Sequence, residues 1–297
     1  MKRYCLILIQ LISAIILVSS VTYAAPTIDG VFRYTESNDW GSLSRTNFNA
    51  TGFNDQTALH NVSVEEGKAG GNTSYNNNYF DVEEIGVYVN DNTLYIGLQT
   101  EYNFTQSPST SNTYAGDFMF DLEKSSDNAN FSDNHGQNNE FAFRFSLSSN
   151  NTVDMTLFAG NLTYKSTTGY NNFGTAWKVN SSDLQMEFNN VGKYSTSNNG
   201  CENGYYNGQY TLEAAIDLNR LSGQLNTLFS GWAQDYQYVT MFWQPSCGND
   251  FLAARSKFDY NPAPEPATLL LFGMGLLGAG ALGRKRISQA HSKKSEI

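Results

Sequence analysis

Apolar and polar residues alternate along several stretches of this chain, and this period of two constrains the fold more than any other feature. Two long pairs of alternating stretches are separated by Asn-rich turns, as in β-hairpins. Their apolar positions are Ile85, Val87, Val89, Leu94, Ile96 and Leu98 in one pair, and Phe141, Phe143, Phe145, Leu147, Val153, Met155 and Leu157 in the other. Residues 212–216 and 239–243 alternate in the same way. Only residues 218–229 have a helical spacing of leucines, which predicts a short helix or a turn there.

One-sided strands bounded by Gly, Asn and Ser clusters are typical of two sheets packed face to face. The sequence therefore predicts an all-β domain, a two-sheet antiparallel β-sandwich of jelly-roll-like type, over residues 25–261. About 240 residues are enough for one large domain of this kind, with two small domains as the less favoured alternative.

The N-terminus has the pattern of a cleaved secretory signal peptide. Lys2 and Arg3 precede an apolar run at 6–18, and Thr22-Tyr23-Ala24 places small residues three and one before a cut. We expect a signal helix within residues 1–24, cleavage after Ala24, and export of the rest.

The C-terminus combines a rigid acidic spacer, an apolar segment and a basic end. Pro264, Glu265 and Pro266 precede the uncharged run 267–283, which is followed by the basic residues Arg284, Lys285 and Arg286. Seventeen residues form a helix of roughly 25 Å, just enough to span a membrane. Basic residues remain on the cytoplasmic side, so the domain would lie outside. The alternative is a plain, permanent single-pass anchor.

This three-part tail, over residues 262–297, resembles the PEP-CTERM sorting signal of Gram-negative, biofilm-forming bacteria. The resemblance implies a transient inner-membrane anchor, cutting near Pro264-Glu265-Pro266 by an exosortase, and delivery to the cell surface or matrix.

The charge balance excludes one class of partner. Seven of the 18 basic residues and one of the 28 acidic residues lie in the signal segment or after the apolar tail, so residues 25–283 carry a net charge of −16. Such a polyanion repels nucleic acid and anionic lipid surfaces. We expect no nucleic-acid partner.

Cysteine usage fits an oxidising compartment. Cys5 leaves with the signal peptide, so Cys201 and Cys247 remain as a pair. A disulfide between them would close a loop of about 46 residues and stabilise the fold by up to roughly 4 kcal/mol. The alternative, two of several metal thiolates, is disfavoured because His60 and His135 do not lie at zinc-ligand spacing from either cysteine.

A weaker resemblance begins at Ile28-Asp29-Gly30 and continues at Asp39-Trp40. These residues are similar to the opening of family 9 carbohydrate-binding modules and their DOMON-like relatives. The resemblance implies a β-sandwich and, by analogy, sugar binding.

Catalytic motifs are absent from the sequence: it contains neither a Gly-x-Ser-x-Gly elbow nor a zinc-protease helix with two histidines four residues apart. We therefore expect no catalytic residues and no enzyme activity. A glycosidase-type carboxylate pair stays open as an alternative to a solvated acidic surface. Its candidates are Glu83, Glu84, Asp117, Asp121, Glu140 and Glu213.

No cofactor is expected, with calcium as the one candidate. Asp121, Asp127 and Asp133 lie among further acidic and Asn residues on one loop and its flanks, where a shell of six to eight oxygens could form. The spacing matches no EF-hand, and a solvated acidic loop is the alternative.

Two functional classes follow. The first is a non-enzymatic surface or matrix protein that binds exopolysaccharide, since aromatic residues in polar loops are well suited to stack on sugar rings. The second is a secreted carbohydrate-active enzyme or its accessory module. The aromatic residues in question are Tyr75, Tyr79, Tyr114, Tyr170, Trp177, Tyr205 and Tyr206; tyrosines that merely cover loop surface are the alternative.

Overall fold

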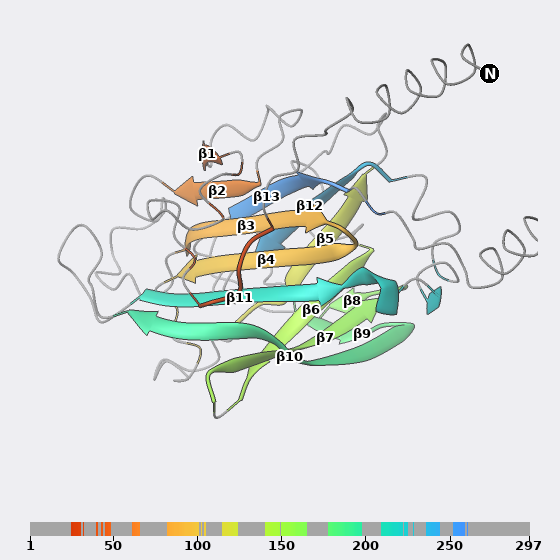
Figure 1. Cartoon of the computed structure of the whole chain (residues 1–297). Helices are drawn as coiled ribbons and strands as arrows, with labels where there is room; N and C mark the ends of the chain where they lie inside the picture. Colours follow the sequence, from red (N-terminus) through yellow and green to blue (C-terminus); the bar gives the residue numbers. More distant parts are fainter. Residues whose placement is uncertain are drawn as a thin grey trace, which may run out of the picture. The chain divides into compact units, whose positions relative to one another are not determined.

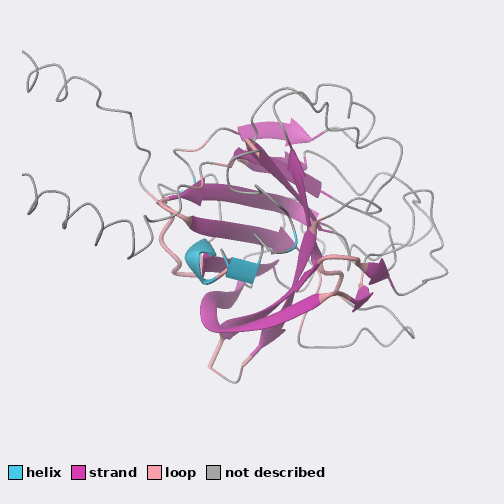
Figure 2. Ribbon diagram, turned by 90° about the vertical axis from the view of Figure 1, so that its right-hand side faces the viewer, coloured by secondary structure: helices cyan, strands magenta, loops and turns pink. Residues whose placement is uncertain are grey.

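The computed structural model describes the following residues: 25–30, 32, 40, 43, 45–48, 61–65, 82–100, 102, 104, 115–123, 140–148, 150–164, 178–197, 209–221, 223–224, 228, 236–243, 252–258 and 260. This part of the chain is almost entirely strand and loop (Figure 2). Its elements are β1 (Arg45–Phe48), β2 (Val62–Glu65), β3 (Val82–Asn90), β4 (Thr93–Thr100), β5 (Phe118–Glu123), β6 (Phe141–Leu147), β7 (Thr152–Ala159), β8 (Thr163–Tyr164), β9 (Val179–Ser181), β10 (Leu184–Ser197), β11 (Gln209–Asp217), the 3-10 helix η2 (Leu218–Arg220), β12 (Tyr238–Trp243) and β13 (Leu252–Lys257).

Eleven of these strands form one continuous sheet in the order β1-β2-β3-β4-β11-β10-β7-β6-β5-β12-β13, and β8 pairs with β9 beside it. Neighbouring strands are antiparallel except β1 and β2. The sheet curls until β13 lies beside β3 (Figure 1). Asn61 connects the two sides: its amide Nδ2 donates to Ser256 Oγ at 3.1 Å, and its backbone oxygen accepts from the Val87 N–H at 2.8 Å.

The predicted antiparallel all-β domain is thus confirmed, whereas its division into two sheets is not, because one sheet runs around the whole core. Within the described residues, no helix has the length and apolar character needed to cross a membrane. The expected signal helix and the C-terminal helix both lie outside those residues.

Both predicted hairpins form. Strands β3 and β4 pair as expected, with Ile85 opposite Leu98 and Val89 opposite Leu94. Asp91 and Asn92 both adopt left-handed backbone angles, with φ of 47° and 62°. Asp and Asn tolerate this conformation, which gives the turn the twist of the flanking strands. In the β6–β7 turn, Asn151 has a φ of 55° for the same reason.

The inner face of the curled sheet encloses the main core. The apolar positions predicted from the alternation lie in this core, all buried except the partly buried Phe145 and Leu147, and β5, β10 and β13 complete the enclosure. Its largest fully buried side chains are Trp243, Phe118, Phe120, Phe141, Phe143, Phe188, Ile85, Leu94 and Ile96.

Two smaller apolar clusters lie on the outer face, each beneath a covering segment. The first is Phe32, Trp40, Leu43 and Val62, packed against the half-buried Tyr88 and Tyr95. The second is Met119, Ala142, Phe158, Val179, Phe242 and Ala253, with Leu162 packed against it. We call the described residues between 25 and 43 the N-terminal strap, and the β8–β9 pair the hairpin cover.

Candidate functional site

The N-terminal strap crosses the outer face of β4 and β11, drawn in red in Figure 1. Its Phe32 ring packs edge-on against Trp40, with centroids 4.9 Å apart. Gly86 and Gly97, opposite each other on β3 and β4, leave room for these rings. A Cβ on Gly97 would lie only 2.3 Å from the Phe32 ring, and one on Gly86 only 2.8 Å from it. Because they lack side chains, the two glycines let the Phe32 and Trp40 rings of the strap pack directly on β3 and β4.

Glu213, fully buried on the outer face of β11, anchors the strap. Its Oε2 accepts hydrogen bonds from the backbone N–H of Gly30 at 2.7 Å and of Asp29 at 3.2 Å. Its Oε1 accepts from the Trp40 indole N–H at 2.7 Å. The Ile28-Asp29-Gly30 turn and Trp40, singled out in the sequence, thus meet on one carboxylate.

In these contacts the Glu213 carboxylate accepts hydrogen bonds from neutral N–H groups and none from a cationic side chain. Burial raises the pKa of Glu213 to about 7, against the opposing effect of the hydrogen bonds from Gly30 and Trp40, while the nearby Asp29 carboxylate raises the pKa further. A glutamate of this kind changes its protonation state near neutral pH. In this position it holds backbone, which is a structural role.

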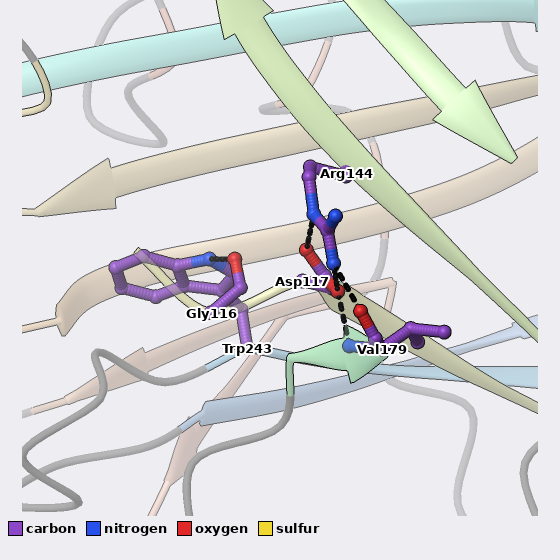
Figure 3. A network of polar contacts seen from close by, with 5 residues as sticks. All are labelled: Gly116, Asp117, Arg144, Val179 and Trp243. Atoms are coloured by element: carbon purple, nitrogen blue, oxygen red, sulfur yellow. Dashed lines mark hydrogen bonds and ion pairs between the residues drawn. The ribbon is translucent and has the colours of Figure 1, made fainter. Parts of the chain in front are cut away.

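The hairpin cover is held by a second buried carboxylate, Asp117 (Figure 3). Asp117 accepts from Arg144 Nε and Nη2, each at 2.8 Å, and from the Val179 N–H at 2.7 Å. Arg144 Nη2 also donates to the Val179 oxygen at 2.6 Å, and its guanidinium lies 4.7 Å from the centre of the Phe158 ring. Both backbone groups of Val179 are therefore fixed by one ion pair.

Further carboxyl groups lie on the outer face of β5 and at the start of β6. Glu123 accepts from Arg255 and from the Thr240 hydroxyl, so it too is in a buried ion pair. Glu140 accepts from the Leu122 N–H at 2.8 Å. Burial raises the pKa of Glu140 to about 8, and the neighbouring Asp121 carboxyl contributes to this rise. Asp121 and Glu140 therefore behave as a carboxyl pair that retains a proton at neutral pH.

Of the three predicted calcium ligands, Asp121 alone is among the described residues; Asp127 and Asp133 lie outside them. Within the described part of the chain no group of three or more acidic, His or Cys side chains is placed to hold a metal ion. Cys201 and Cys247 also lie outside it, as do the seven loop aromatics. The disulfide stays a prediction.

The described domain ends close to the tail. Phe258 and Tyr260 are both buried and stack on each other, with ring centroids 6.1 Å apart. Pro264 follows Tyr260 by only four positions, and all the predicted sorting residues lie outside the described part of the chain: Pro264, Glu265, Pro266, Arg284, Lys285 and Arg286.

A family model for the PEP-CTERM protein-sorting motif matches residues 262–286. The tail is a PEP-CTERM sorting signal. This confirms the prediction made from the spacer, the apolar run and the basic end, and such a motif implies export and handling by an exosortase. Neither the curated proteins nor the solved structures contain a match to the chain.

Sequence reasoning did not predict the anchoring roles of Glu213 and Asp117. Both were candidates for catalytic carboxylates, yet each holds a covering segment in place. The alternation did carry one signal, since it places Glu213 on the outer face between the inward Leu212 and Ala214. An acidic residue in the middle of a strand, with apolar or small residues on both sides (Leu212 and Ala214), is a reasonable candidate for a buried anchor.

Proposed function

We propose that this is an exported, non-enzymatic surface or extracellular-matrix protein of a Gram-negative bacterium, which an exosortase sorts and cuts near Pro264-Glu265-Pro266 and whose β domain binds exopolysaccharide. The PEP-CTERM tail at residues 262–286 is the observation that carries the proposal. A transient inner-membrane anchor and a biofilm-associated destination follow from the same tail.

The physics of the tail supports a temporary anchor. An uncharged run of seventeen residues reaches only roughly 25 Å as a helix, below the typical hydrocarbon thickness of about 30 Å. Gly275, Ala279 and Gly283 recur every four residues and give one side of such a helix a small-residue surface, which lets a second helix approach closely. A membrane-embedded processing enzyme could use that surface.

The short connection between domain and tail supports processing of the folded domain. Four residues from Tyr260 to Pro264 extend to at most about 14 Å. Tyr260 is only 7% exposed, so the fold holds the chain up to that residue. An enzyme that cuts near Pro264 therefore works within a few residues of packed structure. We expect cleavage without unfolding of the domain around Tyr260. Inserting eight Gly/Ser residues after Asn261 should therefore leave the rate of cleavage unchanged or raise it.

Three buried carboxylates support the non-enzymatic reading over the alternative of a carbohydrate-active enzyme. Glu213, Asp117 and Glu123 each accept two or more hydrogen bonds from within the described fold, with oxygens occupied by backbone, indole, hydroxyl or guanidinium donors. A general acid or base must instead face a substrate with a free oxygen.

Incubating the protein with polysaccharides distinguishes a non-enzymatic binding protein from a carbohydrate-active enzyme. The processed protein, purified from the producing cells, should retain polysaccharide on a glycan array without releasing reducing ends. Release that disappears in Asp121→Asn/Glu140→Gln, the described carboxyl pair with a raised pKa, would instead establish the enzyme. Binding to no glycan would leave a structural coat protein.

A further inference from the structure

Six aromatic rings converge at one end of the space inside the curled sheet. Phe104 lies at their centre, after the end of β4, and the others come from the same region and from β6, β10, β11 and β12. We call this group the aromatic end; its members are Tyr102, Phe104, Phe145, Tyr194, Tyr210 and Trp243. The centroid of Phe104 lies 4.8 Å from Phe145, 5.4 Å from Tyr102, 5.9 Å from Tyr194, 6.0 Å from Trp243 and 6.3 Å from Tyr210.

The aromatic end is not buried throughout. Tyr102, Tyr194 and Trp243 are buried, whereas Phe104, Phe145 and Tyr210 are only partly buried. The opposite end of the same interior is closed differently, by the aliphatic Leu218 and Leu221 at η2, both fully or almost fully buried. Three partly buried rings thus lie together at the aromatic end.

A buried hydroxyl without a partner lies within this group. Tyr194 is 5% exposed, and its hydroxyl makes no hydrogen bond in the fold. Its ring stacks on Tyr210 at 6.2 Å and 9°. Burial raises the pKa of the phenol, so the hydroxyl stays protonated and can both donate and accept. A buried hydroxyl without a hydrogen bond lowers the stability of the fold, so the presence of Tyr194 at this position needs an explanation.

Neighbouring polar groups already have partners within the fold. The Trp243 indole N–H donates to the Gly116 oxygen at 3.0 Å (Figure 3), and the Tyr102 N–H donates to Thr100 Oγ1 at 3.1 Å. Neither can turn to Tyr194 without losing its own bond. Within the described part of the chain the Tyr194 hydroxyl thus has no partner, and a bound ligand can supply one.

We propose that the aromatic end binds one ring of an uncharged polysaccharide. The C–H face of a pyranose stacks on the partly buried Phe104, Phe145 and Tyr210 rings, and one sugar hydroxyl hydrogen-bonds with the Tyr194 hydroxyl. A purely apolar ligand would leave that hydroxyl unpaired. An acidic glycan is disfavoured by the charge of −16 on residues 25–283. This inference rests on the polysaccharide binding proposed above and gives it a site.

The test is Tyr194→Phe, which keeps the ring and removes only the hydroxyl. Because that hydroxyl has no partner in the free protein, Tm should stay the same or rise. Affinity for the polysaccharide should fall about tenfold, the range expected for one lost hydrogen bond. The matched control is Tyr95→Phe, on the outer face of β4, which removes a tyrosine hydroxyl away from the aromatic end and should leave affinity unchanged.

Isothermal titration of the processed protein with soluble dextran, mannan and galactan provides the measurement. Wild-type binding to one of these glycans, lost about tenfold in Tyr194→Phe and kept in Tyr95→Phe, supports the site. Equal affinity in wild type and Tyr194→Phe overturns the site but leaves polysaccharide binding elsewhere on the domain. A lower Tm in Tyr194→Phe overturns the premise of an unpaired hydroxyl. Wild-type binding to none of the glycans overturns both this site and the polysaccharide binding, while the sorting proposal stands.

Discussion

The N-terminal strap and the hairpin cover both shield apolar residues of the outer face from solvent, but they are held in place by different contacts. Each covers an apolar cluster on the outer face of the sheet, and each is held by one buried carboxylate. From the described residues Glu213 receives three N–H donors and no cation, whereas Asp117 receives a bidentate guanidinium as well as a backbone N–H. The strap must then depend more on ring packing, and the hairpin cover more on an ion pair.

Phe32→Ala is expected to have the largest effect on stability, because it leaves a cavity between the strap and the two glycines Gly86 and Gly97. Phe32 is fully buried, and such a truncation costs about 3–5 kcal/mol of unfolding free energy. Urea unfolding measures the loss, and Trp40 fluorescence should shift to longer wavelength. The matched control is Leu162→Ala beside the hairpin cover, where the side chain is only partly buried and the loss should be smaller. A loss below about 1 kcal/mol for Phe32→Ala would show that packing does not hold the strap.

Asp117→Asn should have the next largest effect. It leaves Arg144 without its charge partner, which costs about 2–3 kcal/mol, less than for a fully buried pair because Arg144 is 32% exposed. A double-mutant cycle with Arg144→Met isolates the pairwise energy. We expect a favourable coupling of about 1 kcal/mol or more; additive effects would mean that the ion pair does not hold the hairpin cover.

Glu213→Gln should flatten the pH dependence of stability. The folded-state pKa of Glu213, about 7, is raised above its ordinary value, so its contribution is present below pH of about 4.5 and is lost as the pH rises through 7. The wild type should therefore lose on the order of 2 kcal/mol between pH 5 and pH 8 from this group. Gln cannot ionise, although it supplies one acceptor fewer and will lower stability at every pH.

Urea midpoints across pH 5–8 measure this slope. Glu140→Gln serves as the control, because burial raises the pKa of Glu140 to about 8 and its own contribution has the same sign. Each single variant should remove part of the wild-type slope and the double variant most of it. A full wild-type slope in Glu213→Gln would contradict the assignment of the strap's anchor as a titrating group.

Calcium should have the smallest effect. The Asp121 carboxyl helps to raise the pKa of the buried Glu140, on the same side of the sheet as the hairpin cover. Calcium bound by Asp121 together with Asp127 and Asp133 would add a divalent cation beside these two carboxyl groups. If so, dialysis against EDTA should lower Tm by a few degrees and added calcium should restore it. An unchanged Tm would leave the loop as merely solvated.

Local patterning was enough to predict much of the fold. The Asn- and Asp-bearing turns and one-sided alternation fixed β3–β4 and β6–β7, because both signals act within a few residues. Strand β10 was missed because its register shifts between Phe188 and Gly192, which interrupts the alternation. Strand β13 was missed because Arg255 lies within its short sequence, paired with Glu123 from 132 positions away.

The partners of the two anchors could not be predicted from the sequence for a similar reason. Nothing near Glu213 signals that Gly30 and Trp40, 183 and 173 positions earlier, will lie on it. A period of two assigns a side chain to a face of the sheet but does not tell whether another segment covers that face. By contrast, the sorting tail was predictable because its spacer, apolar run and basic end are contiguous.

Mass spectrometry of the intact protein from cells with and without their exosortase tests the central claim most directly. With the enzyme, the mature protein should begin at Ala25 and lack the residues beyond about Pro266. Without it, the protein should keep its tail through Ile297 and remain in the membrane fraction. An intact tail in both strains would contradict the claim that the anchor is temporary.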